Sequence, residues 1–286
     1  MLVLLAIGLA LAAGSEPAEP LAFRVAGGPS ALVAGDGRVW VAAPRAGTVV
    51  ALDAETGEPT GTPLRTGDAP ARLALGRSGV WVADAAAGTV RAVRPPRVFS
   101  PVRLGADATD VALAGGAVWT ASSADGRVYV HDARGTRPLG IGGSPVALAS
   151  DGKRVFVAGS RAGTVTAIDA TTRRAGAPVR VGGAAVDVAL AGDTAWVADA
   201  AGNRIVAVRD GAVVRSVPVG RRPVALATAA EDVYVVTAGE RRLLRVRDGE
   251  VRSSRPLSGD PAAVAVDREH VWVAVPDDDR VLRFDR

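Results

Sequence analysis

From residue 21 onward the chain consists of short apolar runs separated by glycine and polar residues. The runs are four to six residues long, rich in valine, and alternate between apolar and polar or small positions. A two-residue alternation predicts β-strands, because an amphipathic helix would place its apolar residues 3.6 positions apart. The pattern therefore predicts an all-β protein with tight turns.

The predicted strands form a repeat that aligns on one aromatic position. Successive aromatic residues lie 37 to 41 positions apart. They are Trp40, Trp81, Trp119, Phe156, Trp196, Tyr234 and Trp272. Four short strands in a period of about 40 residues are typical of the blades of a β-propeller. We expect each aromatic side chain to fill the gap between neighbouring blades.

The second copy shows the expected blade. Its strands are predicted at residues 71–75, 80–83, 89–93 and 98–104. Seven positions after the aromatic residue, six of the seven copies carry Gly, Asn or Asp, which tolerate a positive φ in a turn. The sixth copy has Arg241 at this position, which marks that blade as atypical.

The last copy ends after its third predicted strand, at residues 280–284, whereas residues 21–25 match a fourth strand. We therefore predict a seven-bladed β-propeller with four-stranded blades, in which the N-terminal strand completes the last blade. Such closure removes exposed sheet edges. The propeller would span residues 21–286 as one domain.

Residues 1–20 differ from the repeat. Residues 2–13 form a continuous apolar run followed by a polar segment, although no Lys or Arg precedes the run. This length is too short for a spanning helix and is typical of a signal peptide or the remnant of a membrane anchor. We expect an extracytoplasmic protein, secreted or anchored to the outer side of the membrane through its N-terminus. The absence of cysteine does not discriminate between compartments.

The formal net charge of +4 raises the question of nucleic-acid binding. Arginines are spread over every copy, with short pairs at 173–174, 221–222 and 241–242, and the aromatic residues lie on strands expected in the core. A nucleic-acid surface needs a continuous basic face with aromatic side chains for stacking. We therefore expect a solvated basic surface and no nucleic-acid partner, while attraction to anionic glycans or lipid headgroups stays open.

Three segments carry a family resemblance: VWVADAAAGTVRAV from Val80, VFVAGSRAGTVTAID from Val155 and VYVVTAG from Val233. They resemble the YVTN-type propeller repeat and, more broadly, the NHL and streptogramin-lyase group. The similarity covers residues 21–286 and implies the propeller fold, but members of such families serve as enzymes, sensor domains and scaffolds. The chain is also similar to extracytoplasmic propellers of some bacterial Ser/Thr kinases, without carrying a kinase signature.

The resemblance to streptogramin lyases implies, for an enzyme, a His and Glu pair with a divalent metal at one propeller face. The chain has two histidines. His131 occupies a third-strand position that is apolar in the other copies, so we expect a packed residue or one at the edge of the sheet. His270, beside Glu269, belongs on the rim opposite the one that the lyases use. We therefore expect a non-catalytic protein, with a lyase or other hydrolytic enzyme using the propeller funnel as the alternative.

The clearest binding candidates lie nine positions before each aromatic residue, where the inner strand approaches the central channel. This inner column reads Ala31, Arg72, Asp110, Ala147, Asp187, Ala225 and Ala263. Charge thus replaces alanine in blades two, three and five. Three positions after the aromatic residue, Asp84 and Asp199 are expected on the same rim of blades two and five.

These positions predict an ion pair between Arg72 and Asp84, and a pair of carboxylates at Asp187 and Asp199. Two adjacent carboxylates repel each other unless a cation, an arginine or a proton intervenes. Asp187 and Asp199 are therefore a candidate site for a divalent cation or a cationic ligand group, with Asp110 contributing. The alternative is that Arg204 or water satisfies these carboxylates.

No other motif supports a cofactor. The acidic run at residues 277–279 lacks ligand spacing and is expected to be a solvated turn. The function predicted from the sequence is a non-catalytic, extracytoplasmic sensor or scaffold module that binds a protein or small ligand at the propeller face. We expect a monomer, and a purely structural module remains a third possibility.

Overall fold

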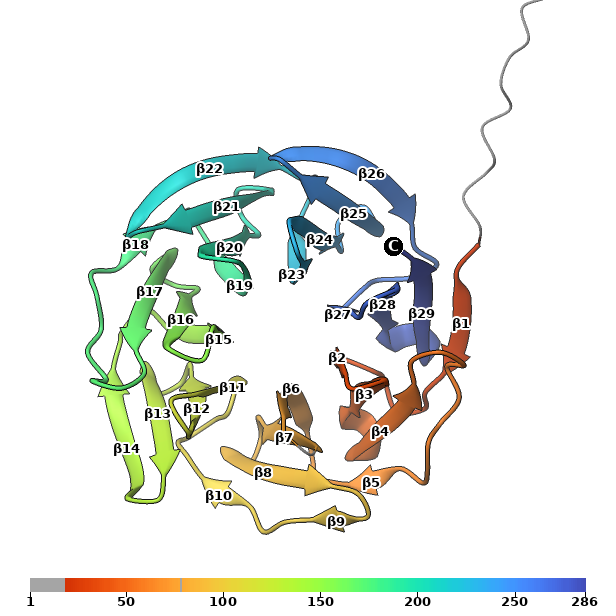
Figure 1. Cartoon of the computed structure of the whole chain (residues 1–286), viewed down its shortest axis with the longest axis horizontal. Coiled ribbons are helices and arrows are strands. Elements are labelled where there is room, and N and C mark those ends of the chain that lie inside the picture. The colour runs from red at the N-terminus through yellow and green to blue at the C-terminus, as the bar shows by residue number, and fades with distance from the viewer. Residues whose placement is uncertain (1–18, 78) are drawn as a thin grey trace, which may run out of the picture.

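The computed structural model describes residues 19–77 and 79–286, which form seven blades around a central axis (Figure 1). Within these residues, helix is confined to two short 3-10 turns, η1 (Pro44–Ala46) and η2 (Pro276–Asp278). No helix in this part of the chain is long and apolar enough to cross a membrane. The predicted seven-bladed β-propeller is confirmed.

Each blade is an antiparallel sheet whose first strand lies nearest the axis. Blades one to three contain β2 (Ala31–Gly35), β3 (Arg38–Ala43), β4 (Thr48–Asp53) and β5 (Leu64–Arg65); β6 (Pro70–Gly76), β7 (Gly79–Asp84), β8 (Thr89–Arg94), β9 (Arg97–Val98) and β10 (Val102–Arg103); β11 (Asp110–Ala114), β12 (Ala117–Ser122), β13 (Arg127–Asp132) and β14 (Gly135–Gly140). Blades four and five contain β15 (Pro145–Ser150), β16 (Arg154–Gly159), β17 (Thr164–Asp169) and β18 (Val179–Arg180); β19 (Ala185–Ala191), β20 (Thr194–Asp199), β21 (Arg204–Arg209) and β22 (Ala212–Pro218). Blades six and seven contain β23 (Pro223–Ala229), β24 (Asp232–Thr237), β25 (Arg242–Arg247) and β26 (Glu250–Pro256); β27 (Ala263–Val266), β28 (His270–Val275), β29 (Arg280–Asp285) and β1 (Leu21–Arg24).

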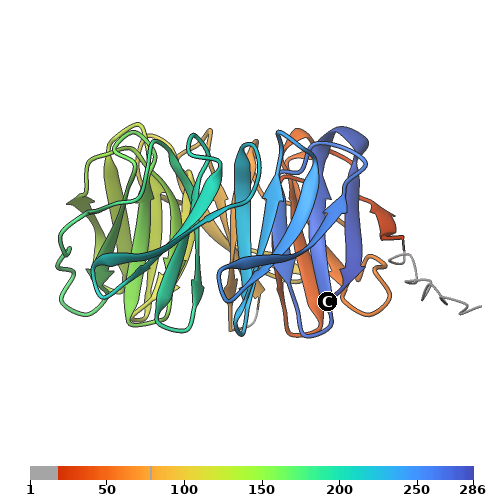
Figure 2. The same ribbon diagram turned by 90° about the horizontal axis from the view of Figure 1, so that it is seen from above.

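The side view shows the turns gathered at two rims (Figure 2). The upper rim is defined as the rim that carries the turns between second and third strands and the connections from one blade to the next. The lower rim carries the turns between first and second strands, and between third and fourth strands. Each inner strand therefore begins at the upper rim and ends at the lower rim.

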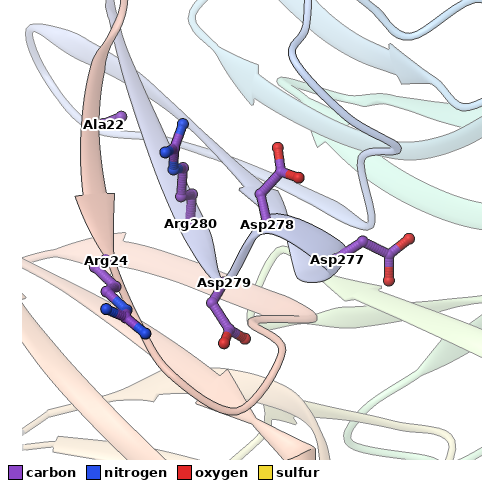
Figure 3. A pocket seen from close by; sticks show the side chains of 6 residues that line it. All are labelled: Ala22, Arg24, Asp277, Asp278, Asp279 and Arg280. Carbon is purple, nitrogen blue, oxygen red and sulfur yellow. The ribbon is translucent and has the colours of Figure 1, made fainter.

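The N-terminal strand closes the ring as predicted. β1 pairs antiparallel with β29, from Leu21 opposite Arg283 to Arg24 opposite Arg280. The last turn of blade seven also binds the connection between β1 and β2. Its Asp279 carboxylate accepts a hydrogen bond from the Gly28 N–H at 2.8 Å. Figure 3 shows Arg24 of β1 beside Asp279 and Arg280 of the last turn.

Seven apolar clusters hold the ring together, and each joins two neighbouring blades. Trp272 of blade seven, for example, is fully buried beside Val39 and Leu52 of blade one. Trp119 of blade three packs in the same way with Val155 of blade four. The aromatic positions therefore fill the gaps between blades, which confirms the expectation from the repeat.

The turn position seven residues after the aromatic residue has a positive φ in every blade, between 51° and 65°. One predicted strand needs correction. Residues 98–104 were expected as a single outer strand of blade two, but β9 and β10 are separate, and both pair with β8. Pro101 lies between them and has no N–H to donate to a sheet ladder, which accounts for the break.

Candidate functional site

A cavity of about 200 Å³ lies at the upper-rim end of the central channel, where the inner strands begin. All seven blades contribute to it, and six of the seven members of the inner column line it. The lining residues are Ala31, Leu32, Arg72, Leu73, Asp110, Val111, Leu148, Asp187, Ala225, Leu226, Ala262, Ala263 and Val264. We call this cavity the channel site. Its walls are small or apolar apart from Arg72, Asp110 and Asp187.

The Arg72 side chain is not held by a carboxylate. Its Nη1 donates to the Ala71 carbonyl at 3.4 Å, and no salt bridge links Arg72 to another described residue. The expected ion pair between Arg72 and Asp84 is therefore absent. A guanidinium with free donors can bind an anionic or carbonyl group of a ligand.

The two carboxylates of the channel site connect neighbouring blades. Asp110 accepts hydrogen bonds from the Leu148 N–H of blade four at 2.6 Å and from the Val111 N–H at 2.8 Å. Asp187 of blade five accepts from the Leu226 N–H of blade six at 2.7 Å. Each aspartate thus ties its own inner strand to the next one around the ring.

Burial dominates the titration of both carboxylates. Burial raises the pKa of Asp110 to about 7, against the opposing influence of the Arg72 charge and the Leu148 N–H. The pKa of Asp187 is also raised by burial, and the Arg72 charge again opposes the shift. The channel site therefore exchanges a proton near neutral pH, and it carries one net negative charge when both aspartates are ionised.

The other two predicted site residues lie outside this cavity. Asp84 accepts hydrogen bonds from the N–H groups of Asp68 at 2.9 Å and Ala87 at 3.1 Å. Asp199 accepts from the Gly202 N–H and from Arg204 Nε, both at 3.0 Å. Arg204 thus satisfies Asp199, which was the alternative considered above.

The strand register separates Asp187 from Asp199. The ladder pairs Asp187 with Ala198, the residue before Asp199. Because successive side chains on a strand point to opposite faces, Asp187 shares a face with Ala198 and not with Asp199. The pairing of Arg72 with Ala83 separates Arg72 from Asp84 in the same way.

Asp84 and Asp199 belong to a set of carboxylates that bind the connection arriving from the preceding blade. Asp125 accepts from the Ala106 N–H at 2.9 Å, and Glu240 accepts from the Arg221 N–H at 3.2 Å. Asp279 instead binds the connection that leaves its own blade for blade one, through Gly28. The sequence columns missed the shared role of the other four, because these carboxylates stand either three or six positions after the aromatic residue.

Neither histidine lines the channel site. His131 Nδ1 lies 2.9 Å from the Thr136 hydroxyl on the neighbouring outer strand. His270 lies at the lower rim. Its backbone N–H donates to the Asp267 carboxylate at 2.7 Å, and its ring packs edge-on against Trp272. Within the described residues, no group of three or more His, Cys, Asp or Glu side chains is arranged to hold a metal ion.

The acidic run at residues 277–279 does not converge on one point. Figure 3 shows the three carboxylates pointing in different directions around a pocket of about 470 Å³. Asp278 accepts from the Ser258 hydroxyl at 3.2 Å, and Asp277 lies 3.6 Å from Arg45. The Asp279 carboxylate binds the N-terminal connection instead.

The protein is a seven-bladed β-propeller with a polar channel site, and comparison with known proteins agrees with this class. No protein-family model and no curated protein sequence matches the chain. Among solved structures, virginiamycin B lyase from Staphylococcus aureus is similar over 94% of this chain and 99% of its own, with a TM-score of 0.83 and 18% identity. A streptogramin B lyase has a TM-score of 0.81 and 16% identity over 92% of this chain and 96% of its own.

A propeller of another functional class is nearly as similar. The structure of the RRP9 WD40 repeats has a TM-score of 0.79 and 13% identity, covering 94% of this chain and 99% of its own. At such identities the likeness establishes the fold alone. Because both lyases and WD40 proteins share this fold, the function has to be argued from the residues of the channel site.

Proposed function

We propose that the protein is a non-catalytic binding module that takes a small ligand, or one side chain of a protein partner, at the channel site. The observation that supports this proposal is a cavity with a free guanidinium and two carboxyl groups but no histidine. The side chains suit a ligand that carries both charges, with its cationic group toward Asp110 and Asp187 and its anionic group toward Arg72.

The size of the cavity supports binding of a small group. Typical sites for drug-sized ligands enclose roughly 300–1,000 Å³, whereas the channel site encloses about 200 Å³. One amino-acid side chain or a metabolite of similar size would fill it. The WD40 neighbour and the resemblance to sensor propellers favour a scaffold or sensor role of this kind.

The proposed location is extracytoplasmic, and the family proposed for the repeat is the YVTN-type and NHL-like group. The location depends on the apolar run at residues 2–13, which lies outside the residues that the structure describes. Fractionation of cells that express the tagged full chain tests it. Recovery in the cytoplasmic fraction alone would contradict the proposed location, without affecting the channel site.

Calorimetric titration tests the channel site directly, with calcium, magnesium and free lysine as probes. At pH 8 Asp110 is mostly ionised, because its pKa is about 7, so the wild type should bind at least one probe. The double variant Asp110→Asn, Asp187→Asn should weaken this binding at least 10-fold, because the carboxylate charges that attract the cationic group are lost.

The matched control is Asp36→Asn with Asp193→Asn, which removes the same two charges from lower-rim turns outside the cavity. This variant should bind as the wild type does. No binding by the wild type, or equal heats in the wild type and the channel-site variant, would overturn the proposal.

A further inference from the structure

A second pocket lies on the upper rim over blade six and its junction with blade seven. It is an open depression of about 740 Å³, and half of its eight lining residues are arginine. They are Arg221, Arg222, Ala238, Gly239, Glu240, Arg241, Arg242 and Asp260. We call it the arginine pocket. It is separate from the channel site, with which it shares no lining residue.

The main chain fixes the two arginine-bearing segments to each other. The Ala238 N–H donates to the Arg222 carbonyl at 3.0 Å, and the Gly239 N–H donates to the Arg221 carbonyl at 3.1 Å. A Cβ added at Gly239 would come within 2.7 Å of the Arg221 carbonyl oxygen, so only glycine permits this approach. The arginines are therefore presented by one hydrogen-bonded unit, which lowers the cost of ordering them around a ligand.

The positive charges of the pocket exceed the negative ones. Arg221 lies 3.8 Å from Glu240, and Arg241 donates to Asp260 at 2.6 Å. Arg242 donates only to the neutral Ser254. Among the described residues, the Arg222 side chain has no hydrogen bond or ion pair, although its backbone N–H donates to Asn203 Oδ1. Two guanidinium groups, those of Arg222 and Arg242, thus have no acidic partner.

Two of these arginines occupy backbone positions that disfavour them. Arg222 has a φ of 55° and Arg241 a φ of 51°. The left-handed region costs an L-residue other than Gly, Asn or Asp about 1–2 kcal/mol. The position of Arg241 holds Gly, Asn or Asp in the other six blades, so the turn itself does not require arginine. Arg241 instead bonds Asp260 across the junction with blade seven, which fixes one wall of the pocket.

We propose that the arginine pocket binds a small ligand through a phosphate or sulfate group, with Arg222 and Arg242 as the principal donors. Guanidinium groups match tetrahedral oxyanions because their planar N–H donors bond two oxygens at once. The excess positive charge of the pocket attracts such a group at low ionic strength.

The experiment replaces the two principal donors. Binding of inorganic pyrophosphate and of a sulfated disaccharide is measured by calorimetry on the full chain at low salt. The double variant Arg222→Asn, Arg242→Gln should bind at least 10-fold more weakly than the wild type. Its melting temperature should stay close to that of the wild type, because neither arginine has an acidic partner and asparagine relieves the left-handed backbone at residue 222.

The control variant Arg134→Asn, Arg161→Asn removes two exposed arginines from outside the pocket and changes the net charge equally. It should retain wild-type affinity. Tighter binding of pyrophosphate assigns a phosphate ligand, and tighter binding of the disaccharide assigns a sulfated one. If the wild type binds neither probe, or if the control variant loses as much affinity as the pocket variant, the proposal is overturned.

Discussion

At the scale of single residues, the carboxylates of this propeller follow two different rules. Asp110 is buried and Asp187 half-buried at the channel, and burial raises the pKa of both. Asp199 is also buried, and burial alone would raise its pKa. The N–H groups of Ala184 and Gly202 and the Arg204 guanidinium outweigh this effect and hold the pKa of Asp199 below its usual value. Partners, and not burial alone, decide which carboxylate remains charged.

The raised pKa of Asp110 predicts a pH effect on stability. The folded value is about 7, whereas an unfolded Asp titrates near 3.9. The folded protein therefore binds the extra proton between these values, and its stability falls as the pH rises from about 4 to about 7. Asp110→Asn removes the buried charge and should flatten the dependence of the melting temperature on pH between about 5 and 8.

Melting temperatures by circular dichroism across this pH range test the effect. Asp193→Asn, an exposed lower-rim variant, should keep the wild-type slope. A slope for Asp110→Asn as steep as that of the wild type would mean that another group causes the dependence.

At the scale of elements, the connections between blades depend on carboxylates that bind main-chain N–H groups. The Asp199 side chain is 1% exposed and accepts hydrogen bonds from Gly183, Gly202 and Arg204. The outer strands differ in another way. β22 and β26 are seven residues long and largely exposed, and a β-bulge interrupts the pairing of each. Such bulges make an exposed edge a poorer template for aggregation.

Asp199→Ala should lower the free energy of unfolding by about 2–4 kcal/mol, because it leaves buried N–H groups without an acceptor. The depressed pKa adds a pH signature. The contribution of Asp199 is present above the unfolded pKa and is lost as the pH falls through the folded value, below about 4.

Urea unfolding at pH 7 and pH 3 measures both effects. The control is Asp193→Ala, because the Asp193 side chain is 66% exposed. Its free energy of unfolding should stay within about 0.5 kcal/mol of the wild-type value. If Asp199→Ala loses no more stability than this control, Asp199 does not hold the connection.

At the scale of the whole molecule, the ring closes where the N-terminal strand meets the last blade. β1 covers the free edge of β29, and Val25 contributes to the apolar cluster between blades seven and one. The closure therefore joins the first and the last strand of the described chain.

Val25→Asp should destabilise the protein by about 3 kcal/mol or more, because Val25 is 3% exposed and its replacement buries a charge. Leu21→Asp is the matched control on the same strand, since Leu21 is 53% exposed. Thermal unfolding measures the stability, and size-exclusion chromatography detects association through an uncovered β29 edge. Equal stability of the two variants would show that β1 does not carry the closure.

The sequence by itself determined the number of blades, the closing strand and the positions of turns and aromatic residues. These features depend on local periodicity and on residues that tolerate a positive φ, both of which are visible along the chain. It also identified Arg72, Asp110 and Asp187 as the charged members of the inner column.

Only the tertiary structure decided how these groups pair. The strand register places Arg72 opposite Ala83 and Asp187 opposite Ala198. Asp84 and Asp199 are each one residue further along their strands, so they point to the other face, toward backbone N–H groups instead of the channel. The partners of Asp110 and Asp187 are the N–H groups of the next blade, nearly 40 residues away along the chain. Repeat columns compare equivalent positions in different blades, and they contain no information about contacts between non-equivalent ones.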